Sequence, residues 1–297
     1  MKKITTSNPW RRIWIFIGLI IISGLQQVFS QGISFELSGL NFQGKGPIVS
    51  GSSLEFGPDG RLYVMQLNGE VKIYTIFKPD RNIYEVTSVE TLFGVKSIPN
   101  HDDNGQSAYD NRSNRQSTGL TVGGTASNPV IYVSSSDPKW GGPSGDKALD
   151  TNSGIITRLT WNGTDWDVMD LVRGLPRSEE NHSTNGVKLT TIQGKPFLLV
   201  ASGGLTNAGA PSKNFAYISE YALSAAVLSI DLEAIDALPT KVDPVSKRVF
   251  KYDLPTLDDP TRANVNNIYN PNEAGYNGID VNDPFGVNDG LNMTMVV

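Results

Sequence analysis

Few side chains in this sequence can carry out acid–base, thiol or metal chemistry. Its 297 residues include two histidines, His101 and His182, and no cysteine. The absence of cysteine excludes disulfides, thiol catalysis and thiolate-bound zinc or iron–sulfur centres. Two histidines are too few for a three-histidine metal site. Because histidine titrates close to neutral pH, one of these two imidazoles is the natural candidate for a general base.

The two histidines have different neighbours. His182 lies in the segment ENHSTNG (180–186), ahead of two predicted strands and a glycine-rich loop. This position makes His182 the candidate general base, and an exposed loop histidine is the alternative. His101 lies in NHDDNG (100–105), where oxygen-bearing side chains indicate either a solvated turn or a calcium-binding loop. Three basic residues close to His182 in the sequence are expected to be solvated at the surface, and binding of anionic groups is the alternative: Arg173, Arg177 and Lys188.

A second group of oxygen-bearing side chains lies in the last part of the sequence. Asp280, Asn282 and Asp283 are candidate calcium ligands, because calcium is bound by several oxygen atoms at once. The segment departs from the EF-hand pattern, since Pro284 occupies a ligand position and no glutamate closes the loop. A solvated loop is the alternative.

Short antiparallel strands are the elements predicted to position these residues. Turn signals such as Pro58-Asp59-Gly60 and Asn68-Gly69 separate runs that favour extended structure. The strands are expected at 53–56, 61–64, 70–76, 119–123, 130–133, 154–161, 166–171, 186–191, 197–201 and 225–232. One short helix is predicted, from Leu232 to Leu238.

The strand pattern repeats with a long period. The middle strands centre near Tyr63, Tyr132 and Leu198, which are 69 and 66 residues apart. Antiparallel hairpins at such a period favour an all-β β-propeller with long loops, and a β-sandwich is the alternative. Three repeats end near residue 232, whereas propellers close with about four or more blades. Residues 31–297 are therefore expected to form an incomplete propeller, truncated after about the first three or four blades.

The first thirty residues are predicted to be a signal peptide. Four basic residues accompany a short apolar run: Lys2, Lys3, Arg11 and Arg12. Small residues then precede a cleavage point before Gln31. A membrane anchor is disfavoured, because the apolar run has about half of the roughly 20 residues that cross a bilayer. The mature protein is expected to be secreted or held at the cell surface, with no membrane span. Residues 31–297 carry a formal charge of −9, which argues against a nucleic-acid partner.

Several segments together resemble the soluble quinoprotein glucose/sorbosone dehydrogenase family, in its large secreted Bacteroidetes-type versions. They are LEFGPDGRLYV (54–64) with NGEVKIY (68–74), RQSTGLTVGGTASNPVIYVSSS (115–136), ENHSTNGVKL (180–189) with FLLVASGGLTN (197–207), and AAVLSIDLEAID (225–236). The resemblance implies a six-bladed propeller, of which this chain has the N-terminal part. It also implies an exported enzyme that oxidises a sugar hydroxyl with pyrroloquinoline quinone and calcium.

The resemblance also assigns site residues. It implies that His182 is the general base and that Gln116, Asn181 and Asn207 contact the cofactor. Two positions depart from the family pattern. Asn181 stands where an acidic neighbour of the base is usual, and Thr206 stands where an arginine is usual. These departures favour the alternative, a non-catalytic secreted or cell-surface propeller that binds carbohydrate or a protein partner.

Overall fold

The computed structural model describes most of the chain between Phe35 and Leu254. The described ranges are 35–100, 114–138, 153–178, 182–204, 223–243 and 246–254. The predicted signal peptide, residues 1–30, lies outside these ranges. The chain divides into two compact units, Met1–Gly39 and Leu40–Val297. All of the described strands belong to the second unit.

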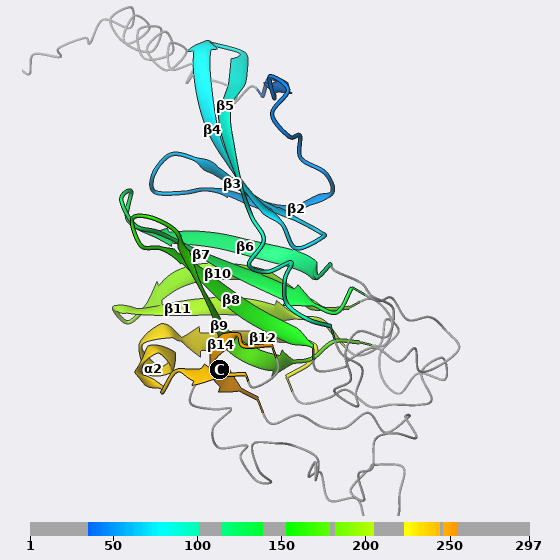
Figure 1. Ribbon diagram of the computed structural model, residues 1–297, viewed down its shortest axis with the longest axis vertical. Coiled ribbons are helices and arrows are strands. Elements are labelled where there is room, and N and C mark those ends of the chain that lie inside the picture. The colour runs from blue at the N-terminus through cyan, green and yellow to red at the C-terminus, as the bar shows by residue number, and fades with distance from the viewer. Residues whose placement is uncertain are drawn as a thin grey trace, which may run out of the picture. The chain divides into compact units, whose positions relative to one another are not determined.

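The first sheet has five strands in the order β1-β5-β4-β3-β2 (Figure 1). Its strands are β1 (Leu40–Asn41), β2 (Gly51–Phe56), β3 (Leu62–Gln66), β4 (Val71–Asp80) and β5 (Ile83–Leu92). Strands β2 to β5 form an antiparallel meander, and β1 adds to β5 in parallel. The predicted turn at Pro58-Asp59-Gly60 joins β2 to β3, and Gly60 supplies the positive φ of 77° that this turn requires.

The second sheet has six strands in the order β13-β14-β9-β8-β7-β6. Its strands are β6 (Gln116–Gly124), β7 (Pro129–Ser136), β8 (Gly154–Trp161), β9 (Trp166–Leu175), β13 (Lys241–Val242) and β14 (Val249–Asp253). Strands β6 to β9 form a second antiparallel meander. Strand β14 comes from much later in the chain and pairs with β9 in parallel. The second sheet is thus extended by a segment that follows the third sheet in sequence.

The third sheet has three antiparallel strands and a short helix. It consists of β10 (Thr184–Ile192), β11 (Lys195–Ser202) and β12 (Ala226–Asp231), followed by α2 (Leu232–Ala237). Asp231 caps the helix, since its carboxylate accepts a hydrogen bond from the Ala234 N–H at 3.0 Å. The cap fixes where the strand ends and the helix begins.

The described part is nearly all β, as the sequence predicts, and its sheets are curled and open (Figure 1). Each predicted strand is present, and so is the helix expected from Leu232. Strand β5 and the β13–β14 pair were not expected from the sequence. Within the described ranges the three sheets do not close into a ring.

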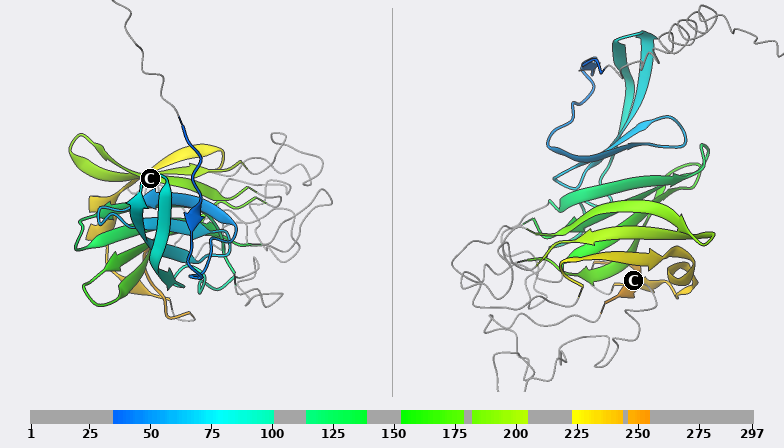
Figure 2. Two further views of the ribbon diagram at one scale, coloured as in Figure 1. Left: turned by 90° about the horizontal axis from the view of Figure 1, so that it is seen from above. Right: turned by 180° about the vertical axis from the view of Figure 1, so that it is seen from behind.

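The strands that begin the three antiparallel meanders are β2, β6 and β10; β6 lies beside both β2 and β10, and side chains join them (Figure 2). Ser52 Oγ donates to the Ser117 carbonyl at 2.7 Å, and Thr118 Oγ1 donates to the Thr184 carbonyl at 2.9 Å. Glu55 accepts hydrogen bonds from β6 and from Lys188 of β10. These bonds satisfy polar groups that no further strand covers within the described sheets.

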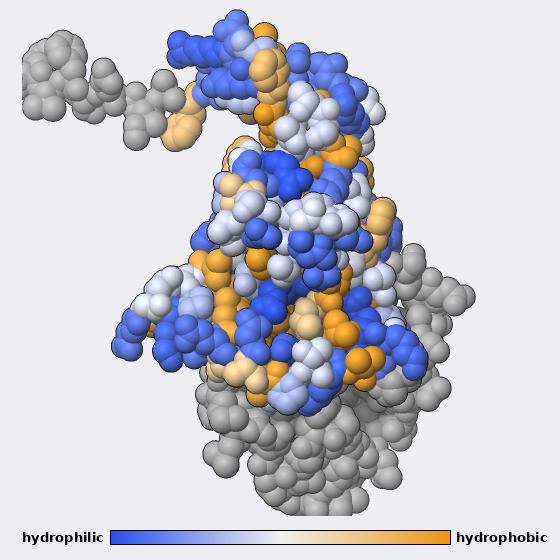
Figure 3. Space-filling model, turned by 60° about the vertical axis from the view of Figure 1, so that its left-hand side comes forward, coloured by the Kyte–Doolittle hydropathy of each residue, from blue (hydrophilic) through white to orange (hydrophobic). Residues whose placement is uncertain are grey.

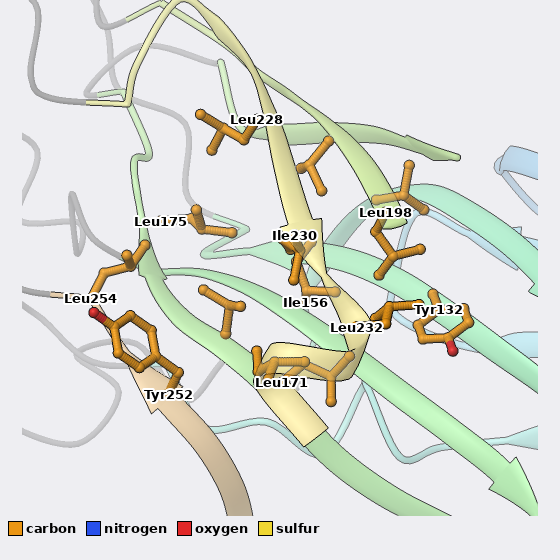
Figure 4. Close-up of a cluster of buried hydrophobic side chains, with 14 residues drawn as sticks. Tyr132, Ile156, Leu171, Leu175, Leu198, Leu228, Ile230, Leu232, Tyr252 and Leu254 are labelled. Atoms are coloured by element: carbon orange, nitrogen blue, oxygen red, sulfur yellow. The ribbon is translucent and has the colours of Figure 1, made fainter. Parts of the chain in front are cut away.

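Apolar side chains fill the spaces between sheets. The largest cluster packs residues of β7, β8 and β9 against the third sheet, with Leu232 and Ile235 of α2 at its end (Figure 4). A second cluster packs Tyr63 and Met65 of β3 against Leu120 of β6 and its neighbours. On the face drawn in Figure 3, exposed apolar side chains form separate patches among hydrophilic ones. Apolar packing thus joins the second sheet to the third and, in a separate cluster, to the first.

Candidate functional site

Polar side chains are buried at one end of the second and third sheets. Gln116 begins β6, Ser136 ends β7 and Thr184 begins β10, and all three are buried. The strand register places them at the same end, because Gln116 pairs with Ser136 and the Thr184 N–H donates to Ser136 Oγ at 3.3 Å. The chain leaves the described ranges at this end after β7, β9 and β11. Buried polar groups at loop-bearing strand ends are where binding and catalytic residues gather.

His182 lies at this end, two residues before β10, and is half-buried. Its N–H donates to the Ser178 hydroxyl at 2.8 Å. Its carbonyl accepts from the Ser178 N–H at 2.9 Å and from Arg177 Nη1 at 2.8 Å. These bonds hold the backbone of His182 against the end of β9.

The imidazole of His182 has a defined tautomer. Nδ1 lies 2.9 Å from the carbonyl oxygen of Gly204. A carbonyl only accepts hydrogen bonds, so the ring proton is assigned to Nδ1, and Nε2 of the neutral ring keeps the lone pair. In this tautomer the ring accepts a further proton at Nε2 while the carbonyl continues to orient it. The basic nitrogen of this tautomer is therefore Nε2.

Gly203 allows the close approach that this hydrogen bond needs. A Cβ atom at Gly203 would lie 2.7 Å from Cβ of His182 and 3.2 Å from the Ser183 carbonyl oxygen. Real Cβ atoms do not approach that closely, so a larger residue would displace the histidine. The glycine-rich loop after β11 therefore has a specific role in placing His182.

Arg177 links Gln116 and His182, the two predicted site residues that lie within the described ranges. Its guanidinium has 0% exposure. Nη2 donates to Gln116 Oε1 at 3.0 Å, Nη1 donates to the His182 carbonyl, and Nε donates to the Asp137 carbonyl at 3.2 Å. One buried side chain thus ties together the ends of β6, β7 and β9 and the start of β10. Gln116 and His182 are brought together by it.

A cavity of about 230 Å³ lies beside Gln116. It is lined by Ser50, Leu67, Asn68, Asn114, Gln116 and Pro138. Because Gln116 Oε1 accepts from Arg177, the amide nitrogen of Gln116 keeps its two donors for other partners. The lining is uncharged, and it offers amide and hydroxyl groups next to two apolar residues. Such a surface suits a neutral ligand that carries hydroxyl groups.

Several predicted site residues cannot be placed. Asn181 and Asn207, the expected cofactor contacts, lie outside the described residues, as do the expected calcium ligands Asp280, Asn282 and Asp283. Within the described ranges, no group of three or more histidine, aspartate or glutamate residues is arranged to hold a metal ion. The same part of the chain contains no helix with the length and apolar character needed to cross a membrane.

The expectation that nearby basic residues are solvated is wrong for two of the three. Arg177 is fully buried, and Arg173 is mostly buried in ion pairs with Asp243 and Asp253. Lys188 is exposed as expected and pairs with Glu55. Arginine is seldom fully buried, so composition favours a surface position. One feature of the sequence is consistent with burial of Arg177: it directly follows Leu175-Pro176 at the end of an apolar strand.

No family model matches the sequence, and no curated protein matches it. Among solved structures, the chain is similar to the calcium structure of a Trichoderma reesei carbohydrate-active enzyme of family AA12. That match has a TM-score of 0.42 and 16% identity, and it covers 68% of this chain and 40% of that chain. The iodide structure of the Trichoderma reesei family AA12 enzyme gives 0.35 and 17%, with coverages of 55% and 32%. The chain therefore spans less than half of the length of these structures.

Proposed function

We propose that this chain forms part of an exported β-propeller that oxidises a sugar hydroxyl, with His182 as the general base. The observation that carries the proposal is the hydrogen bond between His182 Nδ1 and the Gly204 carbonyl. It fixes the tautomer in which Nε2 is the basic nitrogen, at a strand end where polar groups are buried.

The arrangement of the sheets supports the propeller. The meanders β2–β5 and β6–β9 each have four strands, which is the size of a propeller blade. Their first strands, β2 and β6, lie beside each other, and β6 also lies beside β10. Radial repetition of sheets about an axis brings first strands together in this way, whereas two sheets packed face to face pair whole faces.

In the proposed reaction, this chain's residues bind the sugar and remove a proton from it. His182 Nε2 takes the hydroxyl proton, and the Gly204 carbonyl stabilises the resulting imidazolium through Nδ1. Arg177 holds the His182 backbone and the Gln116 amide in place. The uncharged cavity beside Gln116 offers hydrogen bonds to sugar hydroxyls. Bound pyrroloquinoline quinone would supply the acceptor for the two electrons, since no side chain does so.

We infer that a quinone bound at this end would be held by uncharged donors. The hydroxyls of Ser117, Thr184 and Ser202 are buried without a hydrogen-bond partner in the described part of the chain. These hydroxyls do not line the cavity beside Gln116, so the amide of Gln116, which does line it, is the donor that a quinone or carboxylate oxygen would meet. Calcium has no such support among the described residues, and the proposal assigns it no step.

The test uses the whole chain supplied with pyrroloquinoline quinone and calcium, and follows sugar-dependent reduction of a dye across a panel of aldoses. We expect turnover that His182→Gln lowers by roughly 10²–10⁴-fold, the usual contribution of a general base. His101→Gln, which removes the other histidine, is the matched control and should keep its activity. Absence of turnover in the parent, or full turnover in His182→Gln, would refute the catalytic proposal.

The second candidate is a non-catalytic propeller that binds carbohydrate. The uncharged lining of the cavity beside Gln116 favours it, because neutral sugars are bound by amides and hydroxyls against apolar surface. Calorimetric titration with the same aldoses, without quinone, distinguishes the two. Binding that Asn68→Ala and Gln116→Ala weaken, with no dye reduction, would support the binding protein over the enzyme.

A further inference from the structure

A second cavity lies at the second sheet, and it shares no lining residue with the cavity beside Gln116. Its volume is about 220 Å³, many times that needed for one water molecule. Its charged lining residues are Arg115 before β6, Asp170 and Arg173 in β9, Asp243 after β13, and Arg248 before β14. We call it the arginine cavity. Charged side chains from four separate segments of the chain thus line the same cavity.

Strand β9 is distorted so that two of its charged residues line this cavity. Asp170 and Arg173 are three positions apart, and side chains at that spacing point to opposite faces of a regular strand. The register of β8 against β9 skips Leu171, which is the extra residue of a β-bulge. The bulge restores Asp170 and Arg173 to one side, and both line the cavity. Bulges that redirect side chains in this way are frequent beside functional sites.

Arg248 keeps one donor after its bonds within the described residues are counted. Nε and Nη2 donate to the two carboxylate oxygens of Asp170 at 2.8 and 2.7 Å. Nη1 donates to the Gly94 carbonyl at 2.9 Å and to Ser97 Oγ at 3.3 Å. A guanidinium has five N–H groups, so one N–H on Nη2 is left over.

Arg173 keeps two donors by the same count. Nε and Nη2 donate to the Asp253 carboxylate, and Nη1 donates to Asp243 Oδ2 at 2.9 Å. One N–H on Nη1 and one on Nη2 remain among the described residues. The Phe250 ring lies against the guanidinium, with its centroid 3.7 Å from Cζ. Stacking and ion pairs therefore hold Arg173 in place without using all of its donors.

The four carboxylate oxygens that line the cavity each accept at least one hydrogen bond. Asp170 Oδ1 accepts from Thr157 as well as from Arg248, and Asp170 Oδ2 accepts from Arg248. Asp243 accepts from Arg173 on one oxygen and from the Ser246 N–H on the other. Three arginines and two aspartates line the cavity, and the carboxylate of Asp253, which pairs with Arg173, balances the remaining positive charge. A ligand that uses the spare N–H groups must therefore bring acceptor oxygens, and anionic oxygens form the stronger hydrogen bonds to a guanidinium.

We propose that the arginine cavity binds a small oxyanion, which the spare N–H groups of Arg173 and Arg248 hold from two sides. The oxyanion is either a carboxylate or a tetrahedral anion such as sulfate or phosphate. The hydroxyls of Ser153 and Ser246, which also line the cavity, add uncharged donors to the same ligand. The inference is independent of the sugar oxidation proposed above, and its failure would leave that proposal intact.

The first test is calorimetric titration of the whole chain with sodium sulfate, phosphate and acetate. Sodium chloride keeps the ionic strength constant and serves as the control anion, because screening affects all charged groups alike. We expect saturable binding of at least one oxyanion and none of chloride. Saturation by sulfate and phosphate alone would identify a tetrahedral ligand, and saturation by acetate alone a carboxylate. No saturable binding of any oxyanion would overturn the proposal.

The second test places an oxyanion in the cavity by substitution. Ser246→Glu adds a carboxylate next to the spare donors, and Ser246→Gln adds the same volume without charge. The glutamate variant should unfold at a higher temperature than the glutamine variant and bind the oxyanion at least tenfold more weakly. The ion pairs of Asp170 and Asp243 are untouched in both variants. Equal melting temperatures, or undiminished binding by Ser246→Glu, would overturn the assignment to this cavity.

Discussion

Two regions of this protein bury arginine side chains with different hydrogen-bond partners. Beside His182, Arg177 donates to backbone carbonyls and to the Gln116 amide. In the arginine cavity, Arg173 and Arg248 are held by carboxylates and keep spare N–H groups. Carbonyl partners belong to the backbone, so Arg177 fixes chain segments. Carboxylate partners neutralise charge and orient the guanidinium, so the second pair remains able to bind a ligand.

The largest expected effect tests whether Arg177 holds the neighbouring strand ends together through its hydrogen bonds. Arg177→Met removes the hydrogen bonds that a fully buried guanidinium makes to the carbonyls of Asp137, Ser178 and His182, and each hydrogen bond to a charged group contributes roughly 1.5–3 kcal/mol. We expect the free energy of unfolding to fall by about 4 kcal/mol or more, measured by urea denaturation. Arg177→Lys should recover part of the loss, since an ammonium reaches some of these acceptors. An unchanged urea midpoint for Arg177→Met would contradict the role.

The next effect compares a buried ion pair with an exposed one. Asp170 is 1% exposed, so Arg248→Met leaves a buried carboxylate without its partner and should cost about 3 kcal/mol. Arg158→Met breaks the more exposed pair with Asp236 and should cost about 1 kcal/mol or less. Both are read from chemical denaturation. Equal losses would show that the carboxylates of the arginine cavity matter no more than surface pairs.

A smaller effect tests how Gly203 positions His182. Gly203→Ala forces a Cβ to within 2.7 Å of the histidine, and overpacking of this kind costs roughly 1–3 kcal/mol. Gly186→Ala is the matched control, because a Cβ there meets nothing within 4 Å. Thermal melts of the two variants should therefore differ by several degrees. Sugar turnover, where present, should fall in the first variant alone.

The smallest effect is the pH dependence of stability that Glu55 contributes through its hydrogen bonds to β6 and β10. Burial by itself would raise the pKa of Glu55, but hydrogen bonds from Lys188, Thr121 and Val122 outweigh it and lower the pKa below its ordinary value. A lowered pKa stabilises the fold above the ordinary glutamate range, and this stabilisation is lost as pH falls through the folded-state value. Glu55→Gln should lose about 1 kcal/mol at pH 7. The difference from the parent should shrink towards pH 3, as urea titrations at several pH values would show.

Local signals in the sequence predicted most of the strands and few of the contacts between them. Turn residues such as Pro58-Asp59-Gly60 and Asn162-Gly163 mark hairpins between neighbouring strands. Strand β14 was missed because its partner β9 lies far away in sequence, and no local pattern encodes such a pairing. Strand β5 was missed although Ile83 to Leu92 favours extended structure, because no strand was predicted between residues 77 and 118.

The candidate site was also predicted only in part, because contacts between distant segments leave no local sequence signal. His182 was identified from its segment, and Gln116 from a resemblance. What joins them is Arg177, whose role depends on three strand ends meeting. The tautomer of His182 depends on the Gly204 carbonyl, 22 residues further on. Contacts of this kind exist only after folding, so residue types and spacing alone do not predict them.

The pairing of β14 with β9 also sets an order of events during synthesis. Arg248 and its partner Asp170 are 78 residues apart, and the whole third sheet is encoded between them. At roughly 5–20 residues per second, a ribosome makes Arg248 about 4–16 s after Asp170. Until then the second sheet carries a carboxylate without the arginine that neutralises it. A nascent chain that stops before β14 therefore presents an unfinished sheet edge, which is the kind of surface that chaperones bind.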